Sequence, residues 1–184
     1  MSWIQTYNAL KADPLYERNC MVIDIEDIAH ALSNICRFTG HVKDFYSVAQ
    51  HSTFVAARVA PELQLAALLH DAAEAYLGDI ARPLKQELSV GDVSVSEVEK
   101  ELLRKIFDDL NVRWPDDEGW TEIKYYDNVA LLTEADQLLK GGCIEEWDKA
   151  FPEKAEQRPL YPMYPTAAKA AFLGLYEHFR NEEK

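Results

Sequence analysis

The segment Leu65 to Asp79 reads LAALLHDAAEAYLGD, an apolar run that ends in a group of polar side chains. Pro61, just before it, is favoured in the first turn of a helix, and Gly78 is typical of a left-handed helix stop. We therefore predict one helix from Pro61 to about Tyr76. Polar groups at the end of a buried helix require partners. Four side chains of types that can bind metal ions or transfer protons follow the apolar run: His70, Asp71, Glu74 and Asp79.

The rest of the chain also indicates helices, because apolar residues recur at i, i+3, i+4 and i+7. The expected helix starts are Asp24, Ser47 (with Gln50 as its capping-box partner), Pro61, Ser96 (with Glu99), Gly119 and Thr166. Residues 1–23 are expected to form an extended entry segment with at most one short helix, and residues 79–95 a loop that could include a short helical piece near residues 84–88. Because no alternating strand of useful length is present, we predict an all-α helical bundle. It is expected to form a single domain over residues 1–184, with a core at about 24–139 and a C-terminal helix at about 166–181.

The composition narrows the possible functions. The chain has 184 residues and a net charge of −13, which disfavours binding to a nucleic-acid polymer. A nucleotide-like ligand should therefore be small, and its phosphates would need local positive charge. No apolar run reaches the length of a membrane span, and no signal-like start is present, so we expect a cytoplasmic protein with no membrane partner. Three cysteines without CxxC spacing argue against a cysteine zinc site and are expected to be buried thiols.

The polar group at the end of the apolar run predicts a metal site. Histidine and carboxylate ligands suit ions such as Zn, Mn, Fe or Co, although a His-Asp pair alone is a weak signal. The preceding helix carries His51, and a turn near Pro61 would fold it back so that His51 meets His70. A later inward helix face carries Asp127. Glu74, four residues after His70, would share its helix face and could position a water molecule.

Three separated stretches carry a resemblance to a known family. RFTGHVKDFYSVAQHS (residues 37–52), ALLHDAAEAYLGDIARPLK (67–85) and IKYYDNVALLTEAD (123–136) resemble the HD-domain phosphohydrolases, in the branch of the 5′-deoxynucleotidase-like proteins. Phage dATP triphosphohydrolases of the HD type share this branch. The resemblance implies an HD-domain helical bundle that binds a divalent metal (Zn, Co, Mn or Mg). The family's metal ligands fall on His51, His70, Asp71 and Asp127.

The resemblance also implies roles in substrate binding and catalysis. Its catalytic Glu and Asp fall on Glu74 and Asp79. Its phosphate clamp falls on Arg37 and its sugar or base contact on Phe38, which is Trp in the best-known nucleotidases. Beside these positions, Lys85 is a candidate second phosphate contact, and His41 lies near enough to Arg37 in the chain to reach a substrate.

Each of these residues also has a structural interpretation. His51 could be a core histidine, Asp136 could replace Asp127 as the ligand, and Arg37 could serve only in a salt bridge. Surface or loop roles are the alternatives for the remaining candidates, Glu74, Asp79, Lys85 and His41.

The expected function is that of an enzyme, a metal-dependent phosphohydrolase of (deoxy)nucleotides. The favoured reaction is 5′-nucleotidase action on a deoxynucleoside monophosphate, which yields deoxynucleoside and phosphate. One alternative is a dNTP triphosphohydrolase of the dATP type, which releases triphosphate. An alternative of another class is a non-catalytic module that senses a nucleotide. A homodimer or higher homo-oligomer is a further expectation from helical domains with broad apolar faces.

Overall fold

The chain folds mainly into helices, as expected, with two short antiparallel hairpins. The computed structural model describes residues 3–15, 20–141 and 145–182. The helices are α1 (Ile25–Asn34), α2 (Val48–Ala56), α3 (Gln64–Leu68), α4 (Glu74–Leu77), α5 (Arg82–Lys85), α6 (Val95–Asp109), α7 (Asp117–Leu138), α8 (Glu145–Ala150) and α9 (Pro165–Glu182). Two 3₁₀ turns, η2 (Phe38–Gly40) and η3 (Pro61–Leu63), and the strands β1 (Ile4–Gln5), β2 (Lys11–Ala12), β3 (Ser89–Val90) and β4 (Val93–Ser94) complete the described elements.

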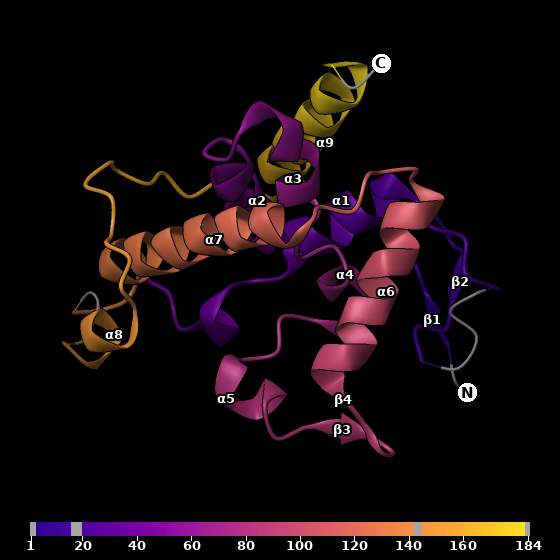
Figure 1. Cartoon of the computed structure of the whole chain (residues 1–184), viewed down its shortest axis with the longest axis horizontal. Helices are drawn as coiled ribbons and strands as arrows, with labels where there is room; N and C mark the ends of the chain where they lie inside the picture. The colour runs from indigo at the N-terminus through magenta and orange to yellow at the C-terminus, as the bar shows by residue number, and fades with distance from the viewer. Residues whose placement is uncertain (1–2, 16–19, 142–144, 183–184) are drawn as a thin grey trace.

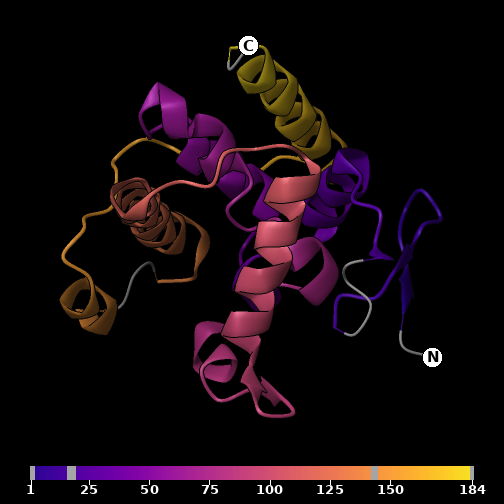
Figure 2. The ribbon, with the colours of Figure 1, turned by 45° about the vertical axis from the view of Figure 1, so that its right-hand side comes forward.

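Five helices pack together at the centre of the described part of the chain. α9 packs against α1, α2 and α3, and α2 also packs against α7, which crosses the molecule as its longest helix (Figure 1). Figure 2 shows the β3–β4 hairpin on the side away from α9, at the far end of α6. Large apolar side chains from several helices are fully buried in this core, among them Leu32, Leu68, Phe107 and Phe172. The fold thus places α2, the chain after α3 and the middle of α7 side by side.

Local capping signals fix several helix starts. The Asp24 side chain accepts a hydrogen bond from the amide of Glu26, and the Ser47 side chain accepts one from the amide of Gln50, so both predicted N-caps are confirmed. The capping box predicted at Ser96 is wrong, because Ser94 and Glu97 form it instead. Both serines fit the S-x-x-E pattern. The β3–β4 hairpin decides between them, since it ends at Ser94 with the extended backbone that an N-cap requires.

The single helix predicted from Pro61 to Tyr76 is wrong, because it is interrupted after Leu68. The α3 segment ends there, and α4 begins only at Glu74. The His70 ring approaches the Ala67 carbonyl oxygen at 2.7 Å, and this is the oxygen that would accept the Asp71 amide in a continuous α-helix. The amides of Ala72 and Glu74 then bond only three residues back. His70 and Asp71 therefore lie on a tight turn, and Glu74 does not follow His70 on one helix face.

The segment between α8 and α9 is held against α2 and α7 by side chains. The Gln50 carboxamide donates to the Tyr161 carbonyl oxygen and accepts from the Met163 amide, each at 2.8 Å. The Gln137 carboxamide on α7 does the same for the neighbouring backbone, donating to the Arg158 carbonyl and accepting from the Leu160 amide. Gln50 therefore does not complete the capping box predicted with Ser47.

Two remaining expectations concern the surface. Within the described residues, no helix has both the length and the apolar character needed to cross a bilayer. The cysteines are less buried than expected, since Cys20 is exposed and Cys36 is half-buried, while Cys143 lies outside the described residues.

Candidate metal centre

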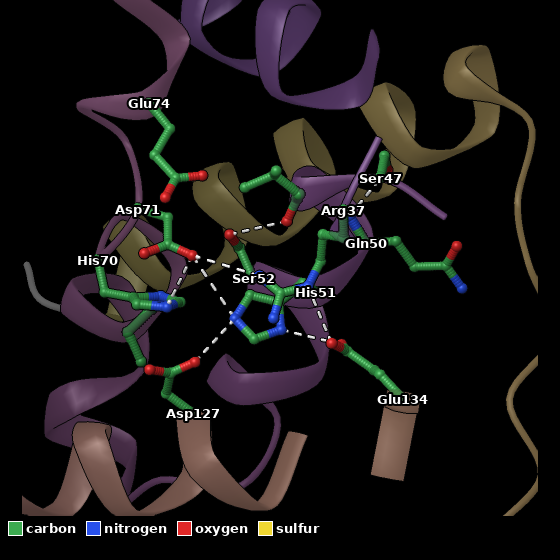
Figure 3. A network of polar contacts seen from close by, with 12 residues as sticks. Arg37, Ser47, Gln50, His51, Ser52, His70, Asp71, Glu74, Asp127 and Glu134 are labelled. Atoms are coloured by element: carbon green, nitrogen blue, oxygen red, sulfur yellow. Dashed lines mark hydrogen bonds and ion pairs between the residues drawn. The ribbon is translucent and has the colours of Figure 1, made fainter. Parts of the chain in front are cut away.

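Side chains from three elements converge at the junction of α2, α7 and the turn between α3 and α4. His51 comes from α2, His70 from the turn and Asp127 from α7, and one ligand atom of each lies within 4.8 Å of the others (Figure 3). Such a group of donor atoms could hold a metal ion. The alternative that Asp136 takes the place of Asp127 fails, because Asp136 is exposed on another face of α7.

Asp71 completes the group. Its Oδ2 lies 3.1 Å from Nε2 of His70 and 3.5 Å from Nε2 of His51. Oδ1 of Asp127 lies 3.2 Å from the same His51 nitrogen. The two imidazole nitrogens therefore face two carboxylates from different parts of the chain.

The orientation of the imidazoles supports a cation at this point. His70 donates its Nδ1–H to the Ala67 carbonyl oxygen, and His51 donates its Nδ1–H to Oε1 of Glu134 at 2.9 Å. Both Nε2 atoms are buried, and among the described residues neither has a partner in hydrogen-bonding geometry. In a neutral imidazole the lone pair of each Nε2 then faces a carboxylate oxygen, and these two atoms repel each other. A proton or a metal cation between the nitrogen and the oxygen relieves this repulsion. The hydrogen bond that each ring donates from Nδ1 is the usual support of a metal-binding histidine.

The electrostatics of the cluster favour a positive charge at its centre. Burial and Arg37 favour the neutral imidazole, but Glu134 and Asp127 outweigh them and raise the pKa of His51 to about 9. Burial opposes ionisation of Asp71 and Asp127, yet the imidazoles hold the pKa of both carboxyls below their usual range. The carboxylates therefore stay charged at neutral pH, as ligands of a divalent cation must.

The structure adds Glu134, a residue that the sequence analysis did not single out. Glu134 is fully buried on α7, where Oε1 binds His51 and Oε2 accepts the Nε–H of Arg37 at 2.9 Å. Burial opposes its charge, but Arg37 and His51 outweigh this and lower the pKa of Glu134. A sequence signal existed, because Glu134 follows Asp127 by two helical turns and so shares its face of α7.

Arg37 is held directly beside the metal cluster. Its guanidinium contacts Glu134 and lies 4.0 Å from Oδ2 of Asp71. Burial opposes its charge, but Glu134 and Asp71 hold the pKa of Arg37 above its usual range. Arg37 therefore forms the salt bridge that the sequence analysis gave as its structural role. This salt bridge also orients the guanidinium towards the cluster.

Glu74 and Asp79 line a pocket that opens beside the metal cluster. Burial and the charges of Asp71 and Asp79 raise the pKa of Glu74 well above its usual range, and one of its buried oxygens has no hydrogen-bond partner. Burial also raises the pKa of Asp79, although Arg37 opposes this. A surface role for Glu74 is wrong, because its side chain is only 6% exposed.

The pocket has a volume of about 1040 Å³ and reaches from the cluster to α8. Its walls include Asp71 and Asp127 as well as all the candidate substrate contacts, Arg37, Phe38, His41 and Lys85. Lys85 is not an exposed loop residue, because its ammonium binds both oxygens of Glu99 and lies 3.8 Å from Glu74. His41 lines the pocket from an exposed position.

Comparison with known proteins gives relatives without an assigned activity. No family model matches the chain. The chain is 48% identical over 89 residues to the uncharacterized protein YfdR of Escherichia coli, covering 48% of this chain and 49% of that protein. It is 39% identical over 105 residues to the uncharacterized protein RCAP_rcc00048 of Rhodobacter capsulatus, covering 52% of this chain and 53% of that protein. The chain thus spans about half the length of the curated relatives it matches.

Proposed function

We propose that this protein is a metal-dependent phosphohydrolase of the HD type that acts on a small nucleotide. The observation that carries the proposal is the convergence of His51, His70, Asp71 and Asp127 directly beside the buried guanidinium of Arg37. These residues come from three separated stretches of the chain, which are the stretches that resemble the HD-domain phosphohydrolases. A cation site next to a fixed arginine suits a phosphate ester, whose charge both can neutralise.

The four ligands proposed from the sequence fit a divalent metal ion, because both orphaned Nε2 atoms point into the cluster. A bound ion would supply positive charge for a phosphate oxygen and make a water molecule more acidic. Arg37, fixed by Glu134, would hold a second phosphate oxygen with its remaining N–H groups. Glu74 has a free carboxyl oxygen in the pocket wall and would take the proton of the attacking water. Asp79, on the same wall, would give a proton to the departing oxygen.

We favour a deoxynucleoside monophosphate as the substrate, since two other cations near the pocket already contact carboxylates. Lys85 binds Glu99 and Lys124 binds Asp127, and Arg37 binds Glu134 through its Nε–H but keeps four further N–H groups, which makes it the main phosphate contact. A dNTP triphosphohydrolase remains the second candidate because of Arg82. This exposed guanidinium lines the pocket and lies over the Phe151 ring, where it could reach a longer phosphate chain.

The direct test is release of phosphate from a panel of deoxynucleoside monophosphates and triphosphates with Zn, Co, Mn or Mg added. We expect native protein to release inorganic phosphate from monophosphates, and we expect His70→Ala to be inactive because it removes a metal ligand. His178→Ala is the matched control, since His178 is an exposed histidine at the far end of α9.

The products distinguish the candidates. Inorganic phosphate from a monophosphate supports the nucleotidase, whereas intact triphosphate from a dNTP supports the second candidate. If native protein releases neither from any nucleotide, the enzyme proposal fails and a nucleotide-sensing module remains. If His70→Ala is as active as native protein, the reaction occurs elsewhere.

A further inference from the structure

The turn that carries Phe38 has an unusual backbone. Phe38 and Thr39 both have positive φ angles, 55° and 53°, and Gly40 follows at 80°. Left-handed backbone is rare for residues with a side chain and is disfavoured for bulky ones. Such strain persists only where the surrounding structure enforces it, and it is most common at functional sites. Here it places the Phe38 ring on the pocket wall directly after Arg37.

A second aromatic ring lies beside Phe38 in the pocket. Trp147 of α8 lines the same pocket, and its ring is 6.3 Å from that of Phe38 between centres, with an angle of 24° between the planes. This distance is near the outer end of the range over which two aromatic rings attract each other, about 4.5 to 7 Å. The two rings are within contact range of each other, and their planes are nearly parallel.

Two nearly parallel rings at this distance resemble the walls of a slot for a planar group. A flat ring held between two others needs a separation of about 7 Å, twice the optimal carbon contact distance. The 6.3 Å between the two ring centres includes any sideways offset, so the ring planes are at most that far apart. The Trp147 side chain would therefore have to move away from Phe38 for a third ring to enter the slot.

The slot and the metal cluster belong to one cavity. The guanidinium of Arg37 lies 5.5 Å from the centre of the Phe38 ring and 4.0 Å from the Asp71 carboxylate, so it separates the aromatic end from the charged end. A ligand with a phosphate at Arg37 and a flat aromatic group a few bonds away fits this order of contacts. A nucleotide has both groups.

We propose that Trp147 and Phe38 hold the base of the nucleotide between them, and that Trp147 determines how strongly the protein prefers a nucleotide to a base-free sugar phosphate. The inference rests on the proposed function for the position of the phosphate. Stacking on an aromatic ring is tolerant of base identity, because every base has a π face. The slot therefore selects for the presence of a base more than for its type.

The test measures binding without turnover. The probe is the phosphonate analogue of 2′-deoxyadenosine 5′-monophosphate, in which a methylene group replaces the ester oxygen, and the reference is the same sugar phosphonate without a base. We expect the nucleotide analogue to quench tryptophan fluorescence and the base-free analogue to leave it unchanged. Calorimetry should show about 10-fold weaker binding of the nucleotide analogue to Trp147→Ala, with base-free binding unchanged.

Two conservative variants locate the signal. Trp147→Phe keeps an aromatic wall, so it should bind the analogue nearly as well as native protein while losing the quench. Trp114→Phe is the control, because Trp114 packs with Phe107 and Trp120 away from the pocket and its replacement should preserve the quench. Thermal unfolding of each variant verifies that the fold is retained.

The outcomes separate this inference from the proposed function. Equal nucleotide affinity in Trp147→Ala and native protein would overturn the slot, even if the protein hydrolyses nucleotides. Equal kcat/KM for deoxyribose 5-phosphate and the deoxynucleotide in native protein would overturn it as well. A quench that depends on Trp147, in a protein that releases no phosphate from any nucleotide, would support the slot and reject the hydrolase.

Discussion

Glu134 links the two charged parts of the pocket through one carboxylate. One oxygen binds the His51 imidazole, the other binds the Arg37 guanidinium, and the side chain is fully buried. It therefore sets both the tautomer of a candidate metal ligand and the direction of the candidate phosphate contact. Carboxylates in this position raise the basicity of the histidine they hold.

Glu134→Gln tests this link. The amide keeps the shape but lacks the negative charge, so we expect affinity for Zn or Co to fall about 10- to 100-fold. The free energy of unfolding should also decrease by about 2 kcal/mol, because a charged hydrogen bond to Arg37 is weakened. Calorimetric titration with the metal and urea unfolding give the two values.

Asp136→Asn is the matched control for Glu134→Gln, since it neutralises an exposed acid on the same helix. It should change neither the metal affinity nor the free energy of unfolding. An equal loss of metal affinity in Asp136→Asn would show that the effect comes from the charge of α7 as a whole. The role assigned to Glu134 would then be wrong.

The short helix α4 places two pocket residues at its two ends. Glu74 begins it, and Gly78 follows its last residue with φ 81° and ψ 160°. This backbone region is essentially restricted to glycine, so the chain leaves α4 in a direction that other residues disfavour. Asp79 comes next and lies on the pocket wall. The glycine was expected as a left-handed stop, and the observed ψ shows a more extended exit.

Gly78→Ala should therefore destabilise the protein by about 2 kcal/mol, from backbone strain alone. An added Cβ at Gly78 would meet no atom within 4 Å, so steric contact is not a second cause. Gly174→Ala is the matched control, because Gly174 lies within α9 and an added Cβ there also meets nothing. The same substitution should stabilise that helix by about 0.5 to 1 kcal/mol.

Urea unfolding measures both glycine variants. We expect the free energy of unfolding to decrease in Gly78→Ala and to increase in Gly174→Ala. A loss of stability in both proteins, or in neither, would contradict the conformational explanation for Gly78.

At the scale of the whole molecule, the candidate metal centre joins α2, the turn before α4 and α7. α7 is distant from the other two in the chain, and α9 also packs against α2. A ligand that binds only the folded arrangement stabilises the whole fold by mass action. Metal binding should therefore be visible as a change in global unfolding.

We expect a suitable metal ion, at about 100 times its dissociation constant, to add about 2.7 kcal/mol to the stability. For a protein of this size the midpoint of thermal unfolding should rise by about 5 to 10 °C. Calorimetric scans with the metal and with a chelator measure the difference. His70→Ala should lose it and His178→Ala should retain it, whereas an equal shift in His70→Ala would contradict the assigned centre.

Features that depend on local contacts were predictable from the sequence. The N-caps at Asp24 and Ser47 follow from hydrogen bonds within one turn of the chain, and the helical character follows from apolar periodicity. The His-Asp pair marked one part of the candidate site. The partners His51 and Asp127 were also chosen from the sequence, with the family resemblance as support.

The remaining features depend on which atoms meet after folding. The His70 ring competes for the Ala67 carbonyl and breaks a helix whose sequence favours continuation. The hairpin selects Ser94 over Ser96, and packing brings Glu134 to both His51 and Arg37. The sequence by itself determined the helical character and the residues able to bind a cation. Only the tertiary structure decided how those residues are oriented, because each orienting hydrogen bond joins groups whose separation is set by packing.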